Sequence, residues 1–242
     1  MTDVPRRHAR TLLATAVVLG VDLGLLVLGV GGWRAFLHHP RAQALYAVWV
    51  LGTIALAWLR PFRGRDAVET ARERWVLLAL FLVPAATPAL SAWAERAALL
   101  PLPGGAWLRD VGLALAAAGY ALRIAAMRRL GVRFSPLVEV QRRHALETGG
   151  PYARIRHPGY LGALLGELGV VLTFGSAATL PLAVALAIAL GARIRHEEET
   201  LARHFGADWH AYRARTGALL PRLGRVQPAR ARAASEPAPP RS

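Results

Sequence analysis

The sequence predicts an all-α protein that crosses a membrane about six times. Hydrophobic residues make up 54% of the 242-residue chain and the mean hydropathy is +0.32, both high for a soluble globular protein. Several apolar runs approach the roughly 20 residues that a helix needs to cross a hydrocarbon core of ~30 Å. We expect spans at residues 11–31, 43–59, 75–93, 108–127, 159–174 and 178–194.

The first four expected spans carry few distinctive polar residues. The first follows an arginine-rich start, as in a signal peptide, but it is long and no small-x-small cleavage site precedes Trp33, so we expect it to be retained. Pro84 and Pro88 are expected to kink the third span. Small residues in the fourth, including Gly112 and Gly119, favour close helix approach.

The last two expected spans are short and are joined by residues 174–176, which predicts a tight helical hairpin. The predicted organisation then has three parts. Residues 1–130 hold the first four spans. Residues 131–222 hold the largest cytoplasmic loop, the hairpin and a C-terminal amphipathic helix. Residues 223–242, rich in Pro, Ala and Arg, are expected to form a disordered tail.

Charge indicates how the chain is oriented. Every Lys or Arg position is an arginine, and the net charge is +15. By the positive-inside rule, the distribution of arginines among the loops places both termini in the cytoplasm. We interpret the arginine distribution as a signal of membrane topology, with some attraction to anionic lipid headgroups, and not as a nucleic-acid interface. The arginines expected on the outer side are Arg34, Arg41, Arg96 and Arg109.

Two further observations restrict the chemistry. The absence of cysteine excludes disulfides, thiolate catalysis and cysteine metal sites. Three ionisable residues, Asp22, Arg123 and Glu167, fall inside apolar runs, where charge is costly and usually faces a partner or a polar cavity. Asp22 and Arg123 could pair, or Arg123 could extend to the interface. Glu167 could line a cavity or make a buried hydrogen bond that fixes helix packing.

The most informative polar segment is the loop at residues 149–160. Gly149, Gly150 and Pro151 form a strong turn signal. Pro158 suits the first turn of a helix, which would place His157 at the helix entrance and Tyr160 about one turn later. By spacing alone this segment fits equally an ordinary interfacial loop and a binding site.

A second polar segment, residues 193–201, continues from the last span. Arg193 and Glu197 are four residues apart, as are Arg195 and Glu199, so each pair can meet on one helix face. Aromatic residues follow at spacings that suit an amphipathic interfacial helix. These are Phe205, Trp209 and Tyr212.

Together these residues resemble the isoprenylcysteine carboxyl methyltransferase family, within the wider group of membrane methyltransferases that includes phospholipid N-methyltransferases. The resemblance runs from about Arg133 to Pro221. Its motifs are Gln141 to His144, Gly150 to Tyr152, Arg156 to Gly162, Glu197, Glu198, Leu201, Phe205, Gly206, Trp209 and Tyr212.

The resemblance implies a methyltransferase that uses S-adenosylmethionine in a cytoplasmic pocket, with no metal. It implies that Glu197 binds a polar or cationic part of the cofactor and that Arg193 meets the substrate carboxylate. Glu147 departs from the aliphatic residue common in the family and is left out of the site. The residues implied to line the cofactor pocket are Gln141, His144, Leu146, Tyr152, His157, Pro158 and Tyr160.

The predicted function is methyl transfer to a lipophilic acceptor, with carboxyl O-methylation of an isoprenylcysteine-like substrate as the family's reaction. N-methylation of a phospholipid or another amphiphile is one alternative, and a transporter or membrane scaffold is another from a different class. A related sterol reductase would instead need a nicotinamide cofactor. The arginine-rich, lysine-free composition suggests a bacterial inner membrane protein. Neither the natural acceptor nor the oligomeric state follows from the sequence.

Overall fold

The computed structural model describes residues 4–59, 71–131 and 146–222, and in these ranges the chain is helical and has no named strand. Two short 3-10 helices, η2 Gly150–Ala153 and η3 Ala177–Thr179, precede α6 and α7. The predicted all-α class is confirmed, whereas the expected tail at 223–242 lies outside the described residues. The helices are α1 Val4–Val30, α2 Trp33–Leu37, α3 Pro40–Leu59, α4 Ala71–Arg96, α5 Gly105–Leu130, α6 Pro158–Phe174, α7 Leu180–Phe205 and α8 Ala207–Arg215.

Five helical segments of the described chain are long and apolar enough to cross a membrane, and they coincide with five of the expected spans. The remaining expected span is α6, an apolar helix whose 17 residues place it at the short end of the spanning range. Large apolar side chains such as Trp58 and Phe81 are more than two thirds exposed. Lipid rather than water would surround them, so the exposure agrees with an integral membrane protein. The five segments are Leu12–Val30, Pro40–Leu59, Trp75–Arg96, Gly105–Leu130 and Ala177–Phe205.

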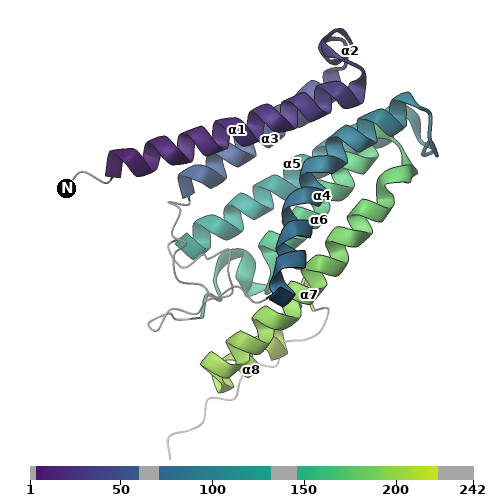
Figure 1. Ribbon diagram of the computed structural model, residues 1–242. Helices are drawn as coiled ribbons and strands as arrows, with labels where there is room; N and C mark the ends of the chain where they lie inside the picture. Colours follow the sequence, from purple (N-terminus) through teal and green to yellow (C-terminus); the bar gives the residue numbers. More distant parts are fainter. Residues whose placement is uncertain (1–3, 60–70, 132–145, 223–242) are drawn as a thin grey trace, which may run out of the picture.

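The most extensive helix contact in the described part is between α5 and α6, which run side by side (Figure 1). Glycines bring the two backbones together. A Cβ on Gly119 would lie 2.5 Å from the carbonyl oxygen of Gly162, and a Cβ on Gly169 would lie 2.7 Å from that of Gly112. The close approach predicted from the small residues of the fourth span is therefore confirmed. The main packing partner of α6 is α5, not α7, its neighbour in the predicted hairpin.

The connection between α6 and α7 is the tight turn that the sequence predicts. Gly175 ends α6 in the left-handed region, with φ 65° and ψ 33°, a conformation that glycine adopts without steric cost. The backbone of this turn pairs with the α4–α5 loop, because Leu102 N donates to Gly175 O over 2.8 Å and Ala177 N donates to Leu100 O over 2.9 Å. This pairing closes one end of the helical bundle.

The same end carries α2 and several ion pairs, and α8 lies at the opposite end (Figure 1). Arg41 pairs with Asp110 over 2.7 Å, and Arg109 pairs with Glu95. Arg41 and Arg109 are two of the arginines expected on the outer side. The buried apolar core also sits toward this end, and its members include Leu26, Val30, Phe36, Leu45, Ala116 and Phe174. This closed, well-packed end leaves the polar residues of the predicted site to the other end.

Candidate active site

The glycine turn that precedes the site is fixed by Glu147. Gly150 has a φ of 56°, which a residue with a side chain rarely adopts. Glu147 Oε1 accepts hydrogen bonds from the backbone nitrogen of Gly149 over 2.8 Å and from Arg129 Nε over 3.0 Å. The residue that departs from the family pattern thus anchors the turn to the end of α5. The short helix η2 follows and buries Tyr152.

The loop enters α6 as the sequence predicts. His157 is the residue before the helix and Pro158 is its first residue, where the missing N–H of proline leaves no bond unmade. The rings of His157 and Tyr160 stack with their centroids 5.5 Å apart and their planes 9° from parallel. This stack directs the Tyr160 hydroxyl toward α7.

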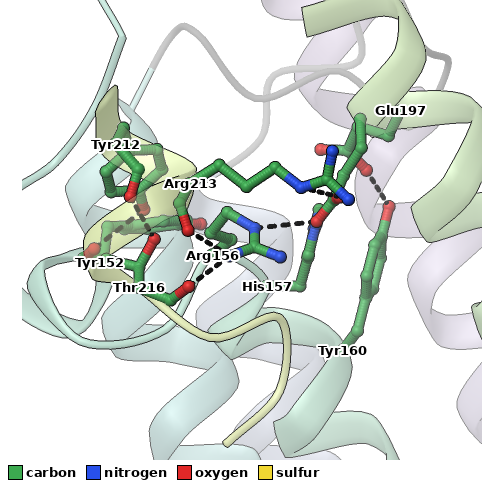
Figure 2. Close-up of polar contacts among 9 residues, drawn as sticks. Tyr152, Arg156, His157, Tyr160, Glu197, Tyr212, Arg213 and Thr216 are labelled. Carbon is green, nitrogen blue, oxygen red and sulfur yellow. Dashed lines mark hydrogen bonds and ion pairs between the residues drawn. The ribbon is translucent and has the colours of Figure 1, made fainter. Parts of the chain in front are cut away.

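The Tyr160 hydroxyl lies between two charged residues of α7, and Figure 2 shows its bond to one of them, Glu197. It donates to Glu197 Oε2 over 2.7 Å and accepts from Arg193 Nε over 2.8 Å. Arg193 is buried, with 8% of its surface exposed. Arg193 and Glu197 are one helical turn apart, so the spacing that placed them on one face also places them on one hydroxyl. A cation, an anion and a phenol thus meet where α6 begins and the membrane part of α7 ends.

Glu198 is the centre of a second cluster, which the sequence did not predict. Its Oε1 accepts from Arg156 Nε over 2.8 Å and lies 3.2 Å from His157 Nε2, while its Oε2 lies 3.7 Å from Arg213 Nε. Arg156 and His157 are both buried. The motif that resembles the family includes Glu198, but its role could not be distinguished from that of Glu197 by position in the sequence.

Arg156 also joins the C-terminal segment to the site loop. Its Nη1 donates to the carbonyl oxygens of Arg213 and Thr216, and its guanidinium lies 5.9 Å from the centre of the Trp209 ring. The backbone continues this connection, because the nitrogens of Arg156 and His157 donate to Gly217 O over 2.8 Å and to Ala218 O over 3.0 Å. The segment after α8 therefore forms one wall of the site (Figure 2).

The aromatic residues of α8 face this loop. The Tyr212 hydroxyl donates to the carbonyl oxygen of Tyr152 over 2.8 Å, and Trp209 is 1% exposed. Burial raises the pKa of Tyr212 to about 12 and also raises the pKa of Tyr152, so both phenols keep their protons at neutral pH. The amphipathic helix predicted to follow the last span is present, and its aromatic face covers the site loop.

The structure brings four predicted site residues into one cluster: His157, Tyr160, Arg193 and Glu197. Pro158 is buried at the start of α6. Tyr152 lies on the far side of Arg156, connected to the cluster through α8. Three predicted residues are not joined to this network by the contacts described: Leu146 is half-buried near the turn, and Gln141 and His144 lie outside the described residues.

Fold and site together define an integral membrane protein with a polar, buried cluster at one end of its helices. Residues 112–203, which run from α5 through α7, match the model of the isoprenylcysteine carboxyl methyltransferase family. Over this region the chain is similar to members of that family.

Individual relatives show the same similarity. The chain is 35% identical over 106 residues to a protein-S-isoprenylcysteine O-methyltransferase of Schizosaccharomyces pombe, covering 43% of this chain and 45% of that one. It is 37% identical over 120 residues to the cobalt-zinc-cadmium resistance protein CzcN of Cupriavidus metallidurans, covering 49% of this chain and 53% of that one. The matches span about half the length of these relatives.

A solved structure shares the fold. The structure of a eukaryotic intramembrane Ras methyltransferase, isoprenylcysteine carboxyl methyltransferase, superposes with a TM-score of 0.54. The match covers 86% of this chain and 75% of the other, at 22% sequence identity. The helical arrangement around the site is therefore that of a known membrane fold.

Proposed function

We propose that the chain is an integral membrane methyltransferase that transfers the methyl group of S-adenosylmethionine to the carboxylate of a lipophilic, isoprenylcysteine-like acceptor. We further propose that it acts at the cytoplasmic face of a bacterial inner membrane. The observation that carries this proposal is the Tyr160 hydroxyl between Arg193 and Glu197. It joins a site for an anion to a site for a cation at the end of membrane helices.

The donor set suits S-adenosylmethionine. The cofactor has cationic groups, a carboxylate and an aromatic base, and it supplies an electrophilic methyl group on a positively charged sulfur. Glu197 uses Oε2 for Tyr160, and its Oε1 makes no hydrogen bond to a described residue, which leaves it for a cationic group. Trp209 Nε1 is a buried donor without a partner in the described chain, and it lies beside Arg156. Orphaned buried donors are rare and indicate a missing acceptor.

Arg193 suits a carboxylate acceptor. An alkyl-substituted carboxylate is ionised at neutral pH, so it needs orientation and charge stabilisation but no general base. Arginine can hold a carboxylate through two parallel, charge-assisted hydrogen bonds. Tyr160 binds Nε of Arg193, which fixes the guanidinium plane. In this role Arg193 aligns a carboxylate oxygen with the methyl group, and the product is a neutral ester.

An amine acceptor fits this site less well. It would have to lose a proton, for which His157 or a glutamate would be the acceptor. The His157 side chain is only 3% exposed, and its Nε2 faces Glu198. The histidine is therefore held in a structural contact with Glu198, which favours O-methylation over N-methylation.

Calorimetry on the protein purified in detergent tests the proposal. We expect S-adenosylmethionine to bind, and we expect Glu197→Ala to weaken binding about tenfold or more through the loss of a charged contact. Glu199→Ala is the matched control, since Glu199 is exposed on the same helix. No binding by the wild-type protein would sink the proposal.

The acceptor is tested with radiolabelled cofactor and N-acetyl-S-farnesylcysteine. We expect base-labile label in the product, as a methyl ester requires, and loss of turnover in Arg193→Ala with cofactor affinity retained. Base-stable label would indicate N-methylation instead. An equal loss of turnover and cofactor affinity would place Arg193 in the cofactor pocket.

A further inference from the structure

A recess lies among α3, α4, α5 and α6, on the membrane side of the site. Its volume is about 370 Å³, part of which is open to the surroundings. The recess extends along residues 162–170 of α6, so it begins within one helical turn of Tyr160. The residues that line it are Trp49, Pro84, Tyr120, Arg123, Gly162, Ala163, Gly166, Glu167 and Val170.

Glycine keeps this recess open. A Cβ on Gly166 would have no atom within 4 Å, although Gly162 and Gly169 on the same helix are packed tightly against α5. Helix packing therefore explains why glycine stands at 162 and 169. At 166 a Cβ would meet no neighbouring atom, so steric contact does not explain that glycine. An added side chain at 166 would extend into free space.

The recess contains a buried donor without a hydrogen-bond partner in the described part of the chain. Arg123 Nε is buried and has no hydrogen-bond partner, and Arg123 forms no ion pair with any described residue. The pairing with Asp22 that the sequence allowed is not formed in the described chain. Glu167 is engaged differently, because it accepts a hydrogen bond from Thr87. A buried polar nitrogen that makes no hydrogen bond is costly, so an oxygen-bearing partner is missing.

A second buried donor without a hydrogen bond to a described residue belongs to another residue that lines the recess. Trp49 lines the recess, and its indole Nε1 is buried without a hydrogen bond. Asp22 Oδ2, on α1, is also buried and unpaired, and a small shift could join it to Trp49. The unpaired nitrogen of Trp49 is therefore weak evidence for a ligand in the recess. Arg123 carries the argument for a ligand with an oxygen.

We propose, resting on the function proposed above, that the recess receives the distal part of the methyl acceptor and that this part carries an oxygen bound by Arg123. The preferred acceptor is then an isoprenylcysteine-like lipid whose tail also carries a hydroxyl, carbonyl or carboxylate group inside the bilayer. Tyr160 and Glu167 are seven residues apart on one face of α6, so the part of the recess at Glu167 lies about 10 Å along the helix from Tyr160.

Fluorescence quenching of Trp49 tests binding without any methyl transfer. The probe is stearate with two bromines at mid-chain, and the Trp49 signal is the difference between wild type and Trp49→Phe. The competitors are stearate and a stearate with a mid-chain hydroxyl. We expect the hydroxylated competitor to displace the probe about tenfold better, as one hydrogen bond to a charged group predicts. Arg123→Leu should abolish that preference.

Two glycine variants test the location. Gly166→Leu should fill the recess and remove the quenching, whereas Gly191→Leu should not, since a Cβ at Gly191 also meets no atom within 4 Å but lies on α7 outside the recess. If Gly166→Leu does not fold, the loss of preference in Arg123→Leu decides the question. Equal displacement by both competitors, or an unchanged preference in Arg123→Leu, would overturn the inference.

The remaining outcomes separate this inference from the proposed function. A protein that methylates N-acetyl-S-farnesylcysteine but shows no Trp49 quenching has no lipid in the recess, and the proposed function stands. A protein that binds the hydroxylated lipid but not S-adenosylmethionine contradicts the proposed function and, with it, the assignment of the recess to an acceptor. Displacement by phosphatidylglycerol as strong as by the hydroxylated lipid would overturn the inference, because the recess would then bind bilayer headgroups.

Discussion

Arg156 Nε donates to Glu198 Oε1 over 2.8 Å, and this ion pair joins the loop before α6 to the C-terminal part of α7 across 42 residues of sequence. Both side chains are largely buried, with 7% and 14% exposed. The same guanidinium binds the carbonyl oxygens of Arg213 and Thr216, so one arginine connects the three segments that form the site.

We therefore expect Glu198→Gln to destabilise the protein. Removing one partner of a buried ion pair leaves the other charge unpaired, which costs about 3 kcal/mol or more in the free energy of unfolding. A thermal unfolding midpoint measured in detergent should fall markedly. Glu199→Gln is the control, because Glu199 is exposed on the same helix. Equal midpoints for the two variants would show that the Arg156 contact contributes little.

Tyr160→Phe should separate the contribution of the hydroxyl from that of the aromatic ring. The variant keeps the stack on His157 but loses both hydrogen bonds to α7. We expect kcat/KM for the acceptor to fall about tenfold to a hundredfold, because the orientation of Arg193 is lost. Initial-rate kinetics measure this fall. The matched control is Tyr46→Phe, whose hydroxyl binds Leu19 O elsewhere in the bundle. Unchanged kinetics in Tyr160→Phe would remove the hydroxyl from the proposed chemistry.

Gly169→Ala should weaken the contact between α5 and α6. A Cβ at this position would overlap the backbone of α5, including Gly112 O at 2.7 Å, and backbone atoms cannot rotate away as side chains can. We expect a lower thermal midpoint. Gly191→Ala, where a Cβ meets no atom within 4 Å, should be neutral or slightly stabilising. The reverse order would contradict the packing described for α6.

The absence of cysteine allows a direct test of orientation. Leu37→Cys places a single thiol at the exposed end of α2, and His210→Cys places one on the exposed face of α8. With both termini in the cytoplasm, a membrane-impermeant maleimide should label the first variant in intact cells and the second only after lysis. Labelling of the His210→Cys variant in intact cells would reverse the proposed orientation.

Much of the site could be predicted from residues close together in the sequence. Pro158 and the glycines before it specify a turn that leads into a helix, and the structure shows that turn and helix start. The four-residue spacing of Arg193 and Glu197 places them on one face. The anchoring of the C-terminal segment by Arg156 could not be predicted in this way, because it joins residues about 60 positions apart.

The sequence by itself determined where the membrane helices lie, which end carries the polar residues and which residue types are available for chemistry. These properties follow from hydropathy, charge and local turn preferences, all of which act over short distances along the chain. Only the tertiary structure decided the roles of Glu197 and Glu198. Adjacent residues on a helix point about 100° apart, so the first meets Tyr160 and the second meets Arg156. Which neighbour each face meets depends on how α6, α7 and the segment after α8 pack.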